Sequence, residues 1–167
     1  VERSIMAKYG MDRPLGEQYV AYVGNVLQGD LGPSLKYKDK SVAELIGEGL
    51  PTSAVIGLSA LTLACLVGIG LGIIAALRQN QMIDNVTMAI AVLGVCIPTF
   101  VTAPLLVLVF AAKLGWLPTA GLNGIRSLIL PVAVLALPQI AIISRLTRAG
   151  MIEVLHSNYV RTARTKG

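Results

Sequence analysis

Residues 49–77 read GLPTSAVIGLSALTLACLVGIGLGIIAAL, a run of 29 residues without a charged side chain. A helix that crosses a bilayer needs about 20 apolar residues, because a rise of about 1.5 Å per residue must cover a hydrocarbon core about 30 Å thick. This stretch is therefore long enough to span a membrane as a helix.

Two further uncharged runs repeat the pattern. Residues 85–112 give 28 uncharged positions, and residues 127–144 give 18, which span only if the helix ends snorkel or the bilayer thins slightly. We predict an all-α membrane protein whose three transmembrane helices cover 51–77, 85–112 and 127–147.

The composition excludes the common soluble classes. Hydrophobic residues make up 54% of the chain and charged residues 14%, against roughly 25% charged in an average soluble protein. Cys65 and Cys96 both lie in apolar runs, so the sequence has neither a disulfide framework nor the spacing of a metal site. A soluble globule, a disordered tail and a disulfide-rich secreted domain are all poor fits.

The distribution of basic residues predicts the orientation. The loop 78–84 and the tail 148–167 carry most of the positive charge near the spans, whereas the loop 113–126 holds only Lys113 and Arg126. Basic residues favour the cytoplasmic side. We therefore expect the C-terminal end to be cytoplasmic and residues 1–50 to lie outside.

The first 50 residues are predicted to form amphipathic helices. Residues 12–28 show helical apolar spacing, and GDLGPS at 29–34 ends that helix. Ser41 and Glu44 form a capping box, and Pro51 is expected to open the first span. Because the sequence shows no cleavable signal peptide before this outer segment, we expect the chain to be the middle of a longer protein.

The spans contain small residues and prolines. GIGLG at 68–72 includes a Gly-xxx-Gly pair, which lets two helices approach closely in lipid, and its position inside an uncharged span argues against a dinucleotide-binding loop. The second and third spans carry Pro98, Pro104, Pro131 and Pro138.

These prolines predict kinked helices, either as bundle geometry alone or around a pathway, because proline leaves backbone carbonyls that need new partners. The polar candidates for the wall of such a pathway are Thr99, Thr102, Gln139 and Ser144.

No catalytic, cofactor-binding or metal-binding motif is present. The sequence has no HExxH, CxxC, GxSxG or P-loop pattern. Glu153 and His156 form E-x-x-H, but a di-iron site needs a second copy, so we expect His156 to be a surface or interface residue. Because no charge falls inside a span, a self-powered proton symporter is disfavoured, and energy for any transport should come from another subunit.

The tail RLTRAGMIEVLHSNYVRTARTKG, residues 145–167, shows helical spacing. Arg161 and Arg164 lie a turn apart, and one apolar flank is predicted to hold Met151, Val154, Leu155, Tyr159 and Ala163. Three interpretations compete: an anchor for anionic lipid, a plain orientation signal, and a helix that enters a groove on a cytoplasmic partner.

The end of this tail carries a family resemblance. YVRTARTKG, residues 159–167, resembles the start of the cytoplasmic loop of ABC-importer permeases, whose pattern is E-A-A-x-x-x-G followed by I-x-L-P. In the peptide-permease branch the segment typically reads Y-[VI]-R-T-A-R-A-K-G. Together with GDLGPSLKYKDKSV, IAALRQN and APLLVLVFA in the same order, it makes the chain similar to B-type membrane subunits of the bacterial oligopeptide and dipeptide permease family.

The resemblance implies the rest of an importer. The fold would be a type I ABC importer transmembrane domain of about six spans, of which three are present here after a periplasmic segment. The partners implied are a second homologous permease, two ABC ATPase subunits, a periplasmic peptide-binding protein, the peptide and the bilayer of the bacterial inner membrane, with no nucleic acid. The chain itself would hold no cofactor and would not be an enzyme, because ATP and Mg²⁺ would bind to the ATPase subunits.

By position, Gly167 matches the glycine of the family motif, Ala163 its second alanine and Thr162 its first, while Arg161 takes the place of the glutamate. The resemblance makes this segment the coupling helix that docks on an ATPase. The residues it assigns to coupling are Glu153, His156, Tyr159, Arg161, Ala163, Arg164 and Gly167.

The alternatives fall into two classes. The same architecture could import dipeptides, glutathione or nickel instead of oligopeptides. From a different class, the chain could be a non-transporting membrane scaffold whose basic tail binds anionic lipid.

Overall fold

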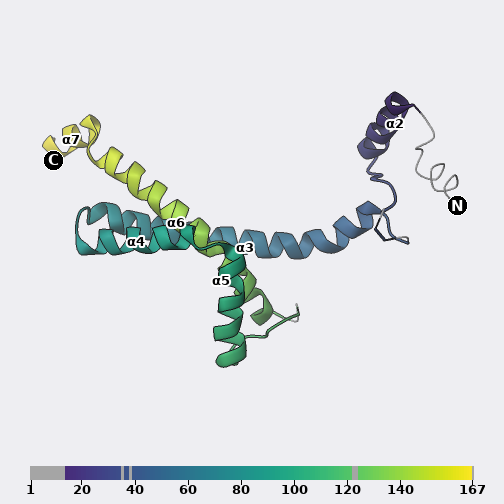
Figure 1. The fold of residues 1–167 in the computed structure, drawn as a ribbon. Helices are drawn as coiled ribbons and strands as arrows, with labels where there is room; N and C mark the ends of the chain where they lie inside the picture. Colours follow the sequence, from purple (N-terminus) through teal and green to yellow (C-terminus); the bar gives the residue numbers. More distant parts are fainter. Residues whose placement is uncertain (1–13, 35, 38, 122–123, 167) are drawn as a thin grey trace. The chain divides into compact units, whose positions relative to one another are not determined.

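The structure, a computed structural model, describes residues 14–34, 36–37, 39–121 and 124–166. Within these ranges the regular structure is helical, apart from an isolated antiparallel bridge between Pro33 and Ser41 (Figure 1). The chain divides into two compact units, Val1–Ala54 and Val55–Gly167, which are taken in turn.

The first unit contains helix α2, Leu15–Leu27, in agreement with the helix predicted over 12–28. The turn that follows needs two residues with positive φ, and both are glycines: Gly29 at 82° and Gly32 at 78°. The side chain of Asp30 stabilises the turn, because its Oδ1 accepts a hydrogen bond from the Gly32 N–H at 2.9 Å. The predicted break after α2 is confirmed.

Helix α3, Val42–Leu77, begins in the first unit and ends in the second. It starts at the predicted capping box: the Glu44 N–H donates to Ser41 Oγ at 3.1 Å, and the Ser41 N–H donates to Glu44 Oε2 at 2.9 Å. Pro51, expected to open the span, instead lies inside the helix. The helix begins nine residues before Pro51, where the capping box satisfies free N–H groups of its first turn. Pro51 then removes only one hydrogen bond, and the helix continues beyond it.

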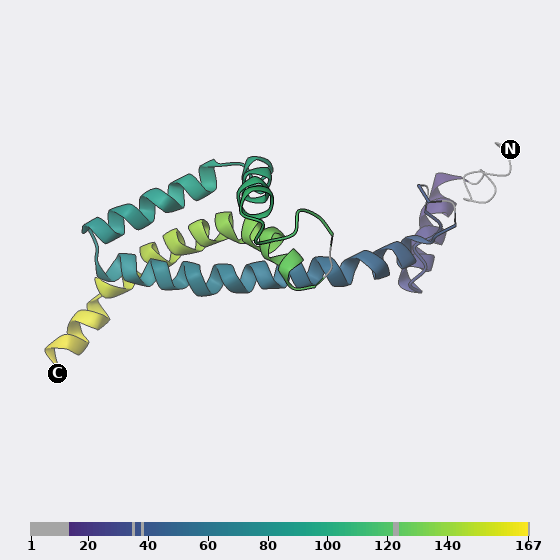
Figure 2. The ribbon, with the colours of Figure 1, turned by 90° about the horizontal axis from the view of Figure 1, so that it is seen from below.

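In the second unit, α6, Arg126–Leu155, lies between α3 and α4, Met82–Cys96 (Figure 2). The buried core is made of small side chains, Ala60 and Ala64 of α3 and Ala136 of α6. The partly buried side chains packed against it are Val132, Ile140 and Ile143. Small core residues bring the helix backbones close together, as is typical of helix packing in lipid.

The face of α3 turned toward α6 carries a small residue at every fourth position. The buried members of this small-residue stripe are Ala60, Ala64, Gly68, Gly72 and Ala76. A Cβ on Gly68 would lie 2.9 Å from two carbons of Ile143, and one on Gly72 would lie 2.6 Å from the Thr147 Cβ. The predicted role of 68–72 in close packing is confirmed, and the stripe extends it in both directions.

Where the sequence predicts one helix over 85–112, the structure has a broken one. Helix α4 ends at Cys96, and it is followed by α5, Thr99–Leu106, and the π-helix η1, Val107–Lys113, at an angle of 101° (Figure 2). Pro98 causes the break, because it has no N–H to donate and its ring forces the preceding residue out of the helical region. Ile97 is accordingly extended, with φ −84° and ψ 115°.

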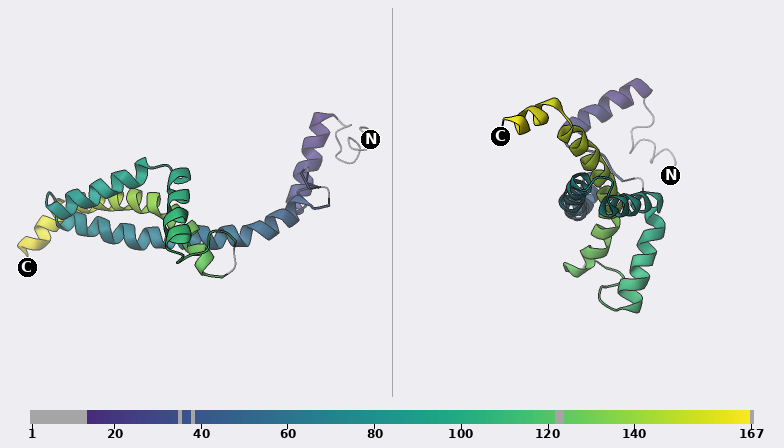
Figure 3. Two further views of the ribbon diagram at one scale, coloured as in Figure 1. Left: turned by 60° about the horizontal axis from the view of Figure 1, so that its bottom comes forward. Right: turned by 90° about the vertical axis from the view of Figure 1, so that its left-hand side faces the viewer.

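Helix α6 continues unbroken through Pro131 and Pro138 and runs eight residues past the predicted end of the third span at 147. A short helix, α7, Asn158–Thr165, follows the break at His156 and Ser157 and lies beyond the end of α6 (Figure 3). The apolar flank predicted along the tail is therefore divided between two helices rather than lying on one.

Two helices, α3 and α6, are long and apolar enough to cross a membrane, and the bent pair of α4 with α5 and η1 makes a third if it counts as one span. Large apolar side chains remain exposed along these helices, for example Leu66 at 72%, Ile90 at 63% and Phe100 at 78%. Such surfaces are solvated by lipid rather than by water. The chain is a helical integral membrane protein.

Candidate functional site

The second unit holds an ion pair between α4 and α6, whose carboxylate is buried and whose guanidinium is partly buried. Arg148 Nε donates to Asp84 Oδ1 at 2.5 Å, and Arg148 Nη2 donates to Asp84 Oδ2 at 2.6 Å. Within the described ranges, Asp84 is the one acidic or basic residue that is buried, at 1% exposure, while the side chain of Arg148 is 25% exposed. A bidentate guanidinium–carboxylate contact fixes both distance and orientation.

Asp84 also fixes the turn that joins α3 to α4. Its Oδ2 accepts a hydrogen bond from the Asn80 N–H at 2.9 Å. Asn80 has a φ of 63°, a left-handed conformation that asparagine tolerates better than most residues. The carboxylate, placed in the first turn of α4 where the helix dipole favours negative charge, thus joins this turn to α6.

The residues of α6 just before Arg148 are held against α3. The Ser144 carbonyl oxygen would lie 2.7 Å from a Cβ on Gly72, so only glycine allows this approach. On α4, a Cβ on Gly94 would contact the Ala141 Cβ at 3.4 Å. We call α3, the 78–81 turn, α4 and the part of α6 from Ile140 to Arg148 the three-helix junction.

The residues predicted for coupling lie on the tail beyond this junction. Glu153 is exposed on α6, and His156 is exposed at the end of that helix, with its Nδ1 2.8 Å from the Ile152 carbonyl oxygen. The remaining described members, all exposed and all on α7, are Tyr159, Arg161, Ala163 and Arg164. Gly167 lies outside the described residues.

Helix α7 presents an open, basic surface. None of its residues is buried, and Tyr159 is 65% exposed. The helix begins after Ser157, whose extended backbone separates it from α6. The structure therefore brings Tyr159, Arg161 and Arg164 together on one short helix available for contact with a partner, and it leaves Glu153 and His156 on the preceding one.

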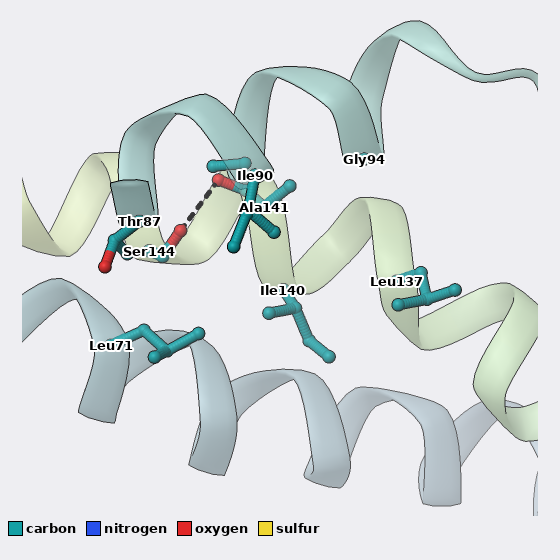
Figure 4. A pocket seen from close by; sticks show the side chains of 9 residues that line it. Leu71, Thr87, Ile90, Gly94, Leu137, Ile140, Ala141 and Ser144 are labelled. Carbon is teal, nitrogen blue, oxygen red and sulfur yellow. Dashed lines mark hydrogen bonds between the residues drawn. The ribbon is translucent and has the colours of Figure 1, made fainter. Parts of the chain in front are cut away.

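The residues predicted to line a pathway are not gathered around one cavity. Thr99 and Gln139 are exposed, and the Thr102 hydroxyl donates to the Pro98 carbonyl oxygen at 3.3 Å. Ser144 alone of the four lines the cavity of about 120 Å³ between α3, α4 and α6, where its hydroxyl donates to the Ala141 carbonyl oxygen at 3.1 Å (Figure 4).

That cavity is mainly apolar. Its lining from the three helices includes Leu71, Ile90 and Leu137, and Thr87 is its other side chain with a hydroxyl (Figure 4). Such a wall suits an apolar group better than a charged solute. No group of three or more potential metal ligands occurs in the part of the chain that the structure describes.

The sequence alone did not predict the pairing of Asp84 with Arg148. In the sequence, Asp84 stands only as the last residue of the loop 78–84, and Arg148 only as one of the basic residues of the tail 148–167. The two residues are 64 positions apart, and the available signal was only that two opposite charges flank apolar runs on the same predicted side of the membrane. Every other described basic residue of 51–167 is exposed, so burial is what distinguishes this arginine.

Comparison with known proteins gives a consistent picture. Residues 68–167 match the family described as binding-protein-dependent transport system inner membrane component. The whole chain is 50% identical to the oligopeptide transport system permease protein OppB of Escherichia coli (strain K12) and covers 55% of it. It is 48% identical, again over its full length and 55% of the relative, to the protein of the same name from Haemophilus influenzae.

A relative named for another cargo is also similar. The chain is 42% identical over its full length to the dipeptide transport system permease protein DppB of Bacillus subtilis (strain 168), of which it covers 54%. The chain thus spans about half the length of the curated relatives it matches.

Proposed function

The chain belongs to the binding-protein-dependent transport system inner membrane components, and on that premise we propose that it forms part of the permease of an ATP-driven importer of oligopeptides. The observation that carries the proposal is the 50% identity, along the whole chain, to an oligopeptide permease. The helical bundle and its lipid-facing apolar surface are consistent with this role.

Oligopeptides are the cargo that the similarity favours. The identity to the dipeptide permease is 42%, lower than the 48% and 50% to oligopeptide permeases. A dipeptide importer is therefore the second candidate. Glutathione and nickel would use the same architecture, but no residue described here selects either of them.

ATP hydrolysis is proposed to occur on separate ABC ATPase subunits that bind at α7. The helix is short, exposed and basic, and it follows directly on a long transmembrane helix. Closure of the ATPases on ATP and Mg²⁺ would move α7, α6 would follow, and the pathway would open to the other side. This chain's contribution is mechanical: it receives a displacement and passes it to the membrane helices.

The remaining partners follow from the same role. A second homologous permease would complete the pathway, and a periplasmic binding protein would deliver peptide. The bacterial inner membrane is the proposed location, with α7 on the cytoplasmic side, because the 78–84 loop and the tail carry more basic residues than the 113–126 loop.

The test begins with purification of the full-length protein from its own cells in mild detergent. We expect a second permease and ATPase subunits to be recovered with it, and we expect the complex to take up oligopeptides in proteoliposomes when ATP and the binding protein are supplied. Isolation of the chain with lipid alone, under conditions that preserve other complexes, would favour a membrane scaffold instead.

A charge-reversal variant tests the docking role of α7. Arg161→Glu with Arg164→Glu should abolish recovery of the ATPase subunits while leaving membrane insertion intact. The matched control, Lys113→Glu with Arg126→Glu, makes the same change in charge at exposed positions in and beside the opposite loop, and it should retain the subunits. Normal peptide uptake by a folded Arg161 and Arg164 double variant would contradict the docking role.

A further inference from the structure

We propose that the Asp84–Arg148 ion pair is a positioning device for transport, which locks the end of α6 to the α3–α4 turn so that the three-helix junction moves with α7 as one body. The proposal rests on the proposed function, because it assumes that α7 is displaced by an ATPase. It assigns to Asp84 and Arg148 a part in the transmission of motion, through α6, without contact to peptide or nucleotide.

The first support is the geometry of the pair. Two parallel contacts of 2.5 and 2.6 Å join Arg148 to both carboxylate oxygens, and the Asn80 N–H binds the same carboxylate at 2.9 Å. Three elements therefore meet at one buried group: α6 through the guanidinium, the 78–81 turn through its backbone, and α4 through Asp84 itself. Displacement of any of them strains contacts to the other two.

The second support is independent of charge. α6 is held on a second side by the small-residue stripe of α3, where Gly68 meets Ile143 and Gly72 meets Thr147 at distances that leave no room for a methyl group. On the side toward α4, Ala141 and Arg148 are seven residues apart, or about two helical turns, and so lie on one face. The segment from Ile140 to Arg148 is thus held by both neighbours.

The third support is that Arg148 lies near the end of α6 that leads to α7. Arg148 lies eight residues before His156, about 12 Å along a helix, and α7 follows directly. A push on α7 therefore reaches the junction across the break at His156 and Ser157 and then along a short stretch of α6. Apolar contacts alone would let α6 slide or rotate against its neighbours, whereas a bidentate pair has one favourable register.

A purely stabilising role explains the pair less well. Removing two charges from water is costly, and apolar side chains of similar volume often give equal or greater stability than a buried ion pair. The stripe of α3 and the core alanines already supply close apolar packing in this bundle. The ion pair adds a directional contact between α4 and α6, close to the end of α6 that leads to α7.

The test measures the number of peptides taken up per ATP hydrolysed by the full complex in proteoliposomes, normalised to the amount of assembled complex. Asp84→Asn and Arg148→Lys should each lower this ratio roughly fivefold or more, the lower limit of typical coupling between sites. Arg148→Lys keeps the charge, and so favours assembly, but loses the bidentate contact.

The matched control is Arg145→Lys, which makes the same substitution three residues earlier on α6 at an exposed position. It should leave the ratio unchanged. If the assembled Arg148→Lys complex takes up as many peptides per ATP as the wild type, the proposal is overturned, because the pair would then serve stability alone. This conclusion holds even if Asp84→Asn assembles in low yield.

Failure of the proposed function has a different outcome. Wild-type protein that recruits no ATPase and takes up no peptide would remove the premise itself. Normal wild-type transport with unaltered ratios in the variants would remove only the role assigned to the ion pair.

Discussion

Substitution of Gly72 by alanine should separate α3 from α6, and the structure fixes how far. The added Cβ would lie 2.6 Å from the Thr147 Cβ and 2.7 Å from the Ser144 carbonyl oxygen, whereas ordinary contact begins near 3.4 Å. The backbone of α6 must therefore move by roughly 0.7 Å, the difference between 3.4 and 2.7 Å. Since the obstacle includes backbone, no side-chain rotation relieves it.

The matched control is Gly70→Ala, two residues away on the same helix, where an added Cβ meets nothing within 4 Å. Both variants gain the same helix propensity of alanine over glycine, about 1 kcal/mol, so their difference isolates the steric term. Overpacking of this kind costs about 1–3 kcal/mol. We therefore expect Gly72→Ala to be less stable than Gly70→Ala by that amount.

The assay is thermal unfolding of the full-length protein in one detergent, followed by the fraction that remains monodisperse after heating. Gly68→Ala should fall between the two variants, because its nearest obstacle, at 2.9 Å, belongs to the side chain of Ile143. Equal stability of Gly72→Ala and Gly70→Ala would refute the close approach of α3 and α6 described here.

Three further predictions concern single contacts. Asp84→Asn should cost roughly 3 kcal/mol of unfolding free energy, because it removes the charge that compensates Arg148, whose side chain is only 25% exposed. A loss no larger than that of exposed Arg145→Gln in the same melting assay would contradict this. Asn80→Val should destabilise the protein by about 1–2 kcal/mol, since a β-branched residue resists a φ of 63°, whereas Asn80→Gly should not. Equal melting temperatures of these two variants would argue against the left-handed turn. Ser41→Ala should remove a helix cap and so cost about 1 kcal/mol of stability at the start of α3. The loss should appear as faster amide hydrogen exchange in the first turn of α3, and unchanged exchange there would argue against the capping box.

The features that sequence predicted well are those set by local chemistry. Uncharged runs located the apolar helices because lipid excludes charge, and Ser41 with Glu44 located the start of α3 because a capping box needs only residues three apart. The Gly68 and Gly72 pair predicted close packing, although not the helix that it meets, which is α6.

The features that sequence missed depend on distant neighbours. Pro51 was expected to begin a helix that in fact starts at Val42, because a proline signal is the same at a first turn and inside a long helix. Four prolines predicted kinked helices but not which of them would end a helix: Pro98 does, whereas Pro104 lies inside α5 and Pro131 and Pro138 lie inside α6. The pairing of Asp84 with Arg148 depends on which helices pack together, and no local pattern encodes that.

The break at Pro98 also determines which part of the second unit must avoid the hydrocarbon. In an uninterrupted helix the carbonyl oxygen of Gly94 would accept from the residue four positions later, but that residue is Pro98, which has no hydrogen to donate. Acyl chains offer no donor to replace it. The corner between α4 and α5 must therefore be in contact with water or covered by protein. Pro98 thus limits the part of the second unit that lipid can contact.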